Sequence, residues 1–142
     1  WYDNLNTMKT CSYYVQQLYS LNKGTEVIDV TMNGKPVAGK DGQNMLYASA
    51  VKDSDKGEYI IKIVNLSNYA QTVNIDLVSA PGELVSAEVT TLHSDNAMAE
   101  NIFTPDTVVP VTRDVRLPQN GSQTMTQSIG GRTFALYRLK FK

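Results

Sequence analysis

Residues 13–32 read YYVQQLYSLNKGTEVIDVTM, and within this stretch the spacing of the apolar residues changes from that of a helix to that of a strand. Before Gly24 the apolar side chains recur at steps of three and four, which is the repeat of one face of an α-helix. After Thr25 they recur at every second position, which is the repeat of a β-strand. The sequence therefore predicts one short helix, over residues 12–22, followed by a domain of a different class.

The predicted helix carries a wide apolar stripe. Its members are two tyrosines, a valine and two leucines: Tyr14, Val15, Leu18, Tyr19 and Leu21. Gly24 can end the helix, because glycine adopts the left-handed conformation without a steric penalty. Burying a large apolar side chain contributes about 1.5–3 kcal/mol, so we expect the stripe to lie against a large apolar surface.

The remainder of the chain reads as short strands separated by turns. Asn33-Gly34 is a tight-turn signal, and the run at residues 59–64 is apolar enough for a central strand buried on both faces. Pro110 places the strand at residues 108–117 at a sheet edge or bulge, because proline cannot donate to a ladder. Gly130-Gly131 is interpreted as a hairpin turn or bulge between the last two strands. About eight such strands predict an antiparallel β-sandwich or barrel.

Composition excludes several classes of partner. The 142 residues fit one domain, and the 13 basic and 14 acidic residues are scattered rather than gathered into a basic stripe. This distribution argues against nucleic acid as a partner. The apolar runs are far shorter than the roughly 18 residues that a membrane span needs, so we expect no membrane insertion. Cys11 is the only cysteine, so no internal disulfide can form.

No residue pattern carries chemistry of its own. Asp53 and Asp55 lie in a polar turn without the ordered oxygen ligands of a cation loop. His93 is the only histidine, and one histidine with Cys11 cannot fill a zinc site. Cys11 before a helix could have a lowered thiol pKa, but a small packed residue explains it as well. The sequence predicts no catalytic residue, no metal and no cofactor.

Several segments, in the right order, resemble one family of sugar-cleaving enzymes. The matching segments span nearly the whole chain: Trp1-Tyr2-Asp3-Asn4, residues 12–25, residues 58–65 ending in Val64-Asn65, residues 101–106 with Val109-Pro110, and residues 133–139. Together they resemble the end of the catalytic barrel and the C-terminal domain of α-L-arabinofuranosidases of glycoside hydrolase family 51. The fold class that follows is all-β: a jelly-roll-like antiparallel sandwich preceded by one short helix left over from a (β/α)8 barrel.

The resemblance implies a division of labour between domains. The barrel of that family removes terminal arabinofuranosyl groups from arabinans and arabinoxylans with retention, using two glutamates. Both glutamates are expected upstream of this chain, since Glu100-Asn101 reverses the order of the family's Asn-Glu pair. Residues 1–24 would be the tail of the barrel and residues 25–142 the sandwich. The chain opens without an initiator methionine or a signal peptide, which agrees with this interpretation.

The resemblance also names the partners. Tyr14, Val15, Leu18, Tyr19 and Leu21 would pack against the chain's own upstream barrel, and an arabinose-containing polysaccharide would meet the parent enzyme. Without the barrel, we expect the helix to fold back on the sandwich, to form an artefactual homodimer with a second copy, or to fray. A secreted, periplasmic or cell-surface bacterial location is expected for the parent.

Two other functions remain open at this point. The sandwich could be a carbohydrate-binding module with its own sugar site, or a structural domain of the adhesion type. A sugar platform needs two or three exposed aromatic faces on one side. The predicted loops at residues 36–44, 53–57 and 118–123 contain no aromatic residue. This favours an accessory domain without its own sugar site.

Overall fold

The computed structural model describes residues 11–37, 42–78, 80–93 and 109–142, with only the backbone of residues 11–14. One helix precedes ten strands in the described residues. In chain order they are α1 (Cys11–Leu21), β1 (Glu26–Ile28), β2 (Thr31–Met32), β3 (Lys35–Pro36), β4 (Leu46–Asp53), β5 (Glu58–Asn65), β6 (Gln71–Asp76), β7 (Leu84–His93), β8 (Val111–Asp114), β9 (Thr124–Ile129) and β10 (Thr133–Phe141). The predicted helix is thus confirmed, shifted by one residue at each end.

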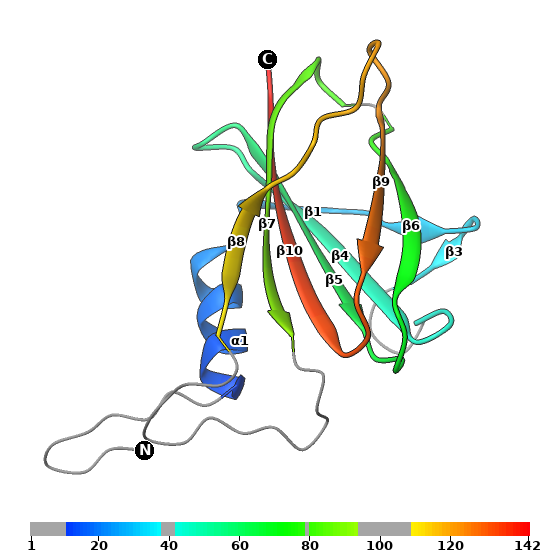
Figure 1. Cartoon of the computed structure of the whole chain (residues 1–142). Coiled ribbons are helices and arrows are strands. Elements are labelled where there is room, and N and C mark those ends of the chain that lie inside the picture. The colour runs from blue at the N-terminus through cyan, green and yellow to red at the C-terminus, as the bar shows by residue number, and fades with distance from the viewer. Residues whose placement is uncertain (1–10, 38–41, 79, 94–108) are drawn as a thin grey trace, which may run out of the picture.

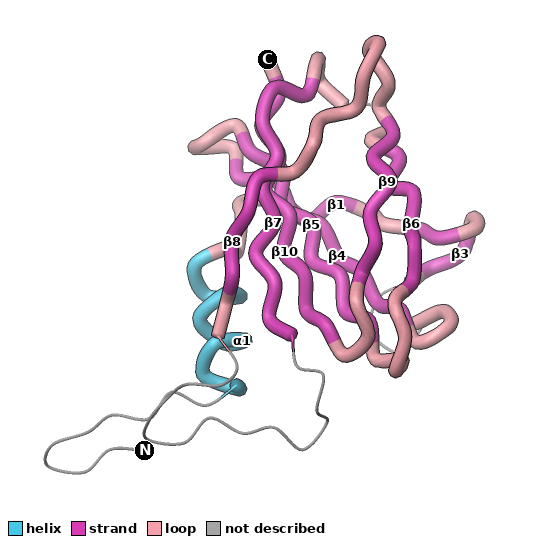
Figure 2. Tube along the Cα trace, viewed as in Figure 1, coloured by secondary structure: helices cyan, strands magenta, loops and turns pink. Residues whose placement is uncertain are grey.

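Six strands form one antiparallel sheet in the order β1-β4-β5-β10-β7-β8 (Figure 1). β10 lies at its centre and pairs with β5 on one side and β7 on the other. A two-stranded sheet of β6 and β9 covers one face of the large sheet. α1 lies on the other face of the large sheet (Figure 2). The predicted all-β sandwich with a single leading helix is therefore confirmed.

The core of the sandwich lies between the two sheets. Its buried members come from both layers: Leu46, Ile63, Ala87, Val89, Val115, Met125, Ile129, Ala135, Tyr137 and Leu139. Successive side chains of a strand point to opposite faces, so β5 contributes Ile63 to this core and Ile60 to the outer face. Both side chains are buried, which confirms that residues 59–64 form an internal strand covered on both faces.

Two glycine positions are fixed by backbone conformation. Asn33 and Gly34 have φ angles of 54° and 74° and join β2 to β3 as the predicted tight turn. Gly24 has a φ of +68°, and a Cβ there would lie 2.7 Å from Val51 Cγ2 and 2.9 Å from the Lys52 carbonyl oxygen. Gly24 therefore ends α1 and lets the backbone approach β4 closely.

The connection through Gly130 and Gly131 differs from the prediction. The sequence suggested a hairpin or bulge, but β9 pairs with β6 and β10 belongs to the large sheet, so the glycines link two layers. Asn65 holds this link: its Nδ2 donates to the carbonyl oxygens of Tyr69, Ile129 and Gly130 at 2.9–3.0 Å. A buried amide with several partners thus replaces the ladder bonds of a hairpin.

Two further strand predictions can be compared with the structure. The strand expected over residues 25–32 is divided into β1 and β2, because the chain leaves the large sheet after Ile28 and turns into the β2–β3 hairpin. β8, which follows Pro110, lies at the edge of the large sheet among the described strands, as the proline predicted.

Candidate functional site

α1 is packed on the outer face of the large sheet through its own apolar residues. Leu18 is 8 % exposed and forms a second buried cluster with residues of β5, β7 and β10: Ile60, Leu92, Phe134 and Leu136. Val15 lies one helical turn before Leu18 and packs against the same cluster. Of the three outcomes expected for a helix without its barrel, the structure shows the first, folding back on the sandwich.

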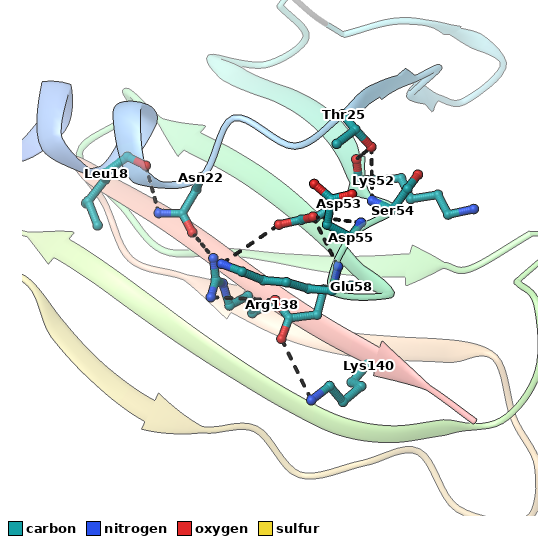
Figure 3. Close-up of polar contacts among 11 residues, drawn as sticks. Leu18, Asn22, Thr25, Lys52, Asp53, Ser54, Asp55, Glu58, Arg138 and Lys140 are labelled. Carbon is teal, nitrogen blue, oxygen red and sulfur yellow. Dashed lines mark hydrogen bonds and ion pairs between the residues drawn. The ribbon is translucent and has the colours of Figure 1, made fainter.

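A polar contact fixes the C-terminal end of α1 to β10 (Figure 3). Arg138 Nη2 donates to Asn22 Oδ1 at 2.6 Å, and Asn22 Nδ2 donates to the Leu18 carbonyl oxygen at 2.8 Å. The Arg138 guanidinium also lies 3.5 Å from Glu58 Oε2, and Lys140 Nζ lies 4.0 Å from Glu58 Oε1. This network anchors the last turn of the helix to the middle of the large sheet.

The segment after α1 is held to the turn between β4 and β5. The backbone N–H of Thr25 donates to the Lys52 carbonyl oxygen at 2.6 Å, and Thr25 Oγ1 accepts from the Ser54 N–H at 2.9 Å (Figure 3). Asp53 Oδ1 accepts from the N–H groups of Asp55 and Lys56 and so caps the turn. Three sets of contacts therefore fix the orientation of α1: the buried cluster around Leu18, the hydrogen bond between Asn22 and Arg138, and the hydrogen bonds of Thr25.

Tyr19 lies at the border between the buried cluster and solvent. Its ring centroid is 5.4 Å from that of Phe134, and Lys62 Nζ lies 4.5 Å from the Tyr19 centroid, which is a cation–π geometry. Lys62 is buried, and this burial lowers the pKa of its ammonium group. Tyr19 itself remains 43 % exposed, so these contacts cover it only in part.

The five residues predicted to meet an upstream domain fall into different environments. Val15 and Leu18 lie against this chain's own sheet, whereas Tyr19 and Leu21 are exposed, Leu21 by 67 %. The side chain of Tyr14 lies outside the described residues. Packing of this helix on an upstream domain stays a prediction, and only the exposed part of the stripe is available for it.

Of the residues considered as reactive groups, His93 is the one whose side-chain contact the structure describes. His93 Nδ1 lies 2.7 Å from Thr133 Oγ1, and the side chain of Cys11 lies outside the described residues, as do Ser94-Asp95 and Glu100-Asn101. Within the described residues, no group of three His, Cys, Asp or Glu side chains could hold a metal ion. None of the helices in this part of the chain has the length and apolar character needed to cross a membrane.

A groove of about 990 Å³ opens between the two sheets on the β4–β5 side. Its floor is the inner face of β4 and β5, its walls are β6 and the β2–β3 hairpin, and no sequence pattern pointed to it. Apolar side chains predominate, including Ala48, Ile61 and Val73. Two carboxylates, Asp29 and Asp76, also line it, and Asp76 Oδ1 accepts a hydrogen bond from Thr124 Oγ1 at 2.7 Å.

Exposed aromatic side chains are not gathered into a platform in the described part of the chain. Tyr19 on α1 and Tyr69 in the β5–β6 connection are the two that are strongly exposed there. They lie on separate elements, and the Tyr19 ring contacts Phe134 and Lys62.

The charged contacts on the outer face of the large sheet were not predicted from the sequence. Lys62 and Arg138 interrupt apolar runs, and this pattern could have indicated that face.

Comparison with known proteins gives a consistent picture. The model of the family described as "Alpha-L-arabinofuranosidase C-terminal domain" matches residues 1–128. No curated protein matches the chain. Solved structures of longer proteins share the fold. The arabinose-bound MgGH51 α-L-arabinofuranosidase has a TM-score of 0.80 at 22 % identity, over 99 % of this chain and 21 % of that one.

The α-L-arabinofuranosidase of Thermotoga maritima in complex with arabinose has a TM-score of 0.69 at 17 % identity, over 91 % of this chain and 28 % of that one. The GH51 arabinofuranosidase of Xanthomonas axonopodis pv. citri has a TM-score of 0.70 at 20 % identity, over 97 % of this chain and 28 % of that one. At these identities the likeness concerns the fold. The chain spans between about a fifth and just over a quarter of the length of these three proteins.

Proposed function

The chain belongs to the α-L-arabinofuranosidase C-terminal domain family, and we propose that it serves as the non-catalytic accessory sandwich of an α-L-arabinofuranosidase. In this proposal, an upstream barrel removes terminal non-reducing arabinofuranosyl groups from arabinans or arabinoxylans with retention, and both of its catalytic glutamates lie outside this chain. The barrel is also the sandwich's direct partner, and the polysaccharide meets the sandwich only through the parent enzyme.

The observation that carries this proposal is the incomplete burial of α1. The large sheet covers Leu18 but leaves Leu21 67 % and Tyr19 43 % exposed, so the apolar stripe is wider than the sheet can cover. Leaving a large apolar side chain in water forgoes about 1.5–3 kcal/mol. A second apolar surface beside α1 would supply the missing contact, and a barrel that precedes the helix fits that role.

The contacts of the acidic residues support an accessory role. Asp53 caps a turn, Glu58 is paired with Arg138 and Lys140, and Asp76 accepts from Thr124. These carboxylates therefore hold loops and strands together.

The proposal also includes a domain boundary between residues 24 and 25. In this proposal, α1 is the element that contacts both domains.

The test compares this chain with the full-length protein. We expect release of arabinose from an aryl α-L-arabinofuranoside by the full-length protein and no release by the 142-residue chain. Replacing Leu21 by Ser should leave the melting temperature of the chain within about 1 °C, because the side chain is exposed there. The same substitution should lower the melting temperature of the full-length protein by several degrees.

Two results would overturn the proposal. One is hydrolysis by the 142-residue chain alone, which would place the catalytic groups within it. The other is binding of arabino-oligosaccharides to the chain with millimolar or tighter affinity in a calorimetric titration. That result would favour the alternative, a carbohydrate-binding module with its own sugar site.

A further inference from the structure

Lys62 is a charged residue on the face of the large sheet that α1 covers. It is 6 % exposed, and its cross-strand partner Leu136 belongs to the buried cluster around Leu18. Its ammonium group lies 4.5 Å from the centroid of the Tyr19 ring, which comes from α1. Docking of the helix therefore removes this charge from water.

No carboxylate of α1 can compensate for the lost water, because the 11 residues of the helix contain no Asp or Glu. Tyr19 is the one titratable side chain of α1 that the structure describes. Its aromatic face attracts a cation, but it offers no lone pair to the three N–H donors of an ammonium group. The ring therefore replaces only part of the hydration of Lys62.

The sheet does not supply a carboxylate partner either. Alternation places these titratable groups on the same face of β4, β5 and β10 as Lys62: Tyr47, Asp53, Glu58, Arg138 and Lys140. Asp53 caps the β4–β5 turn, and Glu58 is paired with the two basic residues of β10. Among the described residues, none of these groups forms a hydrogen bond or ion pair with the Lys62 ammonium.

The neutral amine is the form of Lys62 that the docked helix accommodates better. Burial lowers the pKa of Lys62, because the charged form loses its hydration. A lysine that is exposed to water has a pKa of about 10.4. The protein with α1 docked therefore gives up this proton at a lower pH than the protein with α1 undocked.

We propose that protonation of Lys62 controls how tightly α1 is held on the sheet, with weaker docking over the ammonium and stronger docking over the neutral amine. Between the pKa of the docked lysine and about 10.4, the undocked form binds more protons than the docked form. Docking therefore strengthens as the pH rises through this range and is weakest below it. The helix and the lysine together form a pH-dependent switch within this chain.

The test measures amide hydrogen exchange of α1 by quenched flow and NMR in the 142-residue chain, with β10 as the internal reference. From about pH 7 to about pH 9.5, before most tyrosines ionise, we expect the protection factors of α1 to rise. The maximum rise is about tenfold for each pH unit that separates the two titrations. Lys62→Met keeps an unbranched side chain without the charge, so α1 should be better protected near pH 7 and show no rise.

The matched control is Lys52→Met. The ammonium of Lys52 lies 5.8 Å from the centroid of the Tyr59 ring, and neither residue belongs to the cluster that packs on α1. This substitution also removes a lysine from beside an aromatic ring. It should leave the protection of α1 and its dependence on pH unchanged.

A reciprocal measurement does not depend on replacing the lysine. Undocking α1 by Leu18→Ala should move the titration of Lys62, followed by the NMR resonance of its Cε, toward that of an exposed lysine. The proposal is overturned if Lys62→Met and the unchanged protein show the same pH profile of α1 protection. It is equally overturned if Lys62 titrates at the same pH with and without Leu18→Ala.

Discussion

At the residue scale, Gly24 is required for two separate reasons. Its φ of +68° favours glycine, and a Cβ would lie within 2.9 Å of Val51 and of the Lys52 carbonyl oxygen. Gly24→Ala should therefore lower the free energy of unfolding by about 2–4 kcal/mol, from strain and overpacking together. Urea unfolding followed by circular dichroism measures this change.

Gly57 provides the matched control for Gly24. Its φ is +67°, but nothing lies within 4 Å of the point where a methyl group would stand, so only the conformational cost remains. Gly57→Ala should cost about 1–2 kcal/mol. Equal costs at the two sites would contradict the close approach of the backbone to β4 at Gly24.

Asn65 is the residue that joins the two sheets at one end of the sandwich. It is fully buried, and besides its three donated bonds its Oδ1 accepts from the backbone N–H and the hydroxyl of Ser67. Asn65→Ala should cost at least about 3 kcal/mol in urea unfolding, because several buried backbone groups lose their partner at about 1–3 kcal/mol each. Asn68→Ala, at an exposed position, should cost less than about 1 kcal/mol; a similar cost for both would refute this role for Asn65.

At the element scale, α1 is stabilised by docking on the large sheet. The helix has only 11 residues, which is too short for a stable isolated helix in water. Its order therefore depends on the cluster around Leu18 and on the contact between Asn22 and Arg138. The sequence predicted the helix and its apolar stripe, but the repeat alone did not show which part of the stripe meets the sheet.

Leu18→Ala should undock α1 without unfolding the sandwich. Removing a buried leucine costs about 2–4 kcal/mol, which corresponds to tens to hundreds of times faster amide exchange in α1. Hydrogen exchange resolved by residue measures this, with β10 as the internal reference. Leu21→Ala is the control, since Leu21 is 67 % exposed and alanine is a good helix former. Comparable acceleration by both variants would contradict the observed docking.

At the scale of the whole molecule, the titration of Tyr137 makes the stability of the fold depend on pH in the alkaline range. Burial in the core raises the pKa of its phenol to about 12, and the positive charge of Arg113 opposes this effect in part. An unfolded tyrosine titrates near about 10. The folded state therefore holds its proton where the unfolded state loses it. The contribution of Tyr137 is complete below about pH 10 and decreases as the pH rises toward about 12.

The expected loss is about 2–3 kcal/mol, from a shift of about two pKa units. Urea unfolding at several pH values between 9 and 12 should show a smaller decrease of stability for Tyr137→Phe than for the unchanged protein. Near neutral pH the two proteins should differ little, because the hydroxyl makes one long contact, 3.5 Å from Gln127 Oε1. If the free energy of unfolding falls equally for the two proteins between pH 9 and 12, the titration of Tyr137 is not what couples stability to pH.

Much of the architecture could be predicted because it depends on local chemistry. The change of repeat at Gly24, the Asn33-Gly34 turn and the edge position after Pro110 each follow from backbone preferences of a few neighbouring residues. The family also follows from short segments in order along the chain, which the family model over residues 1–128 bears out. These properties are determined by the sequence itself.

The pairing of the strands and the partner of α1 were decided only by the tertiary structure. Gly130-Gly131 reads as a hairpin locally, yet it connects two sheets, because the register of β9 on β6 and of β10 on β5 is set by burial across the whole sandwich. Alternation shows which side chains share a face, but not what covers that face. Only the folded chain shows that the sheet buries Leu18 and leaves Tyr19, Met45 and Leu66 exposed, because coverage depends on contacts between residues distant in sequence.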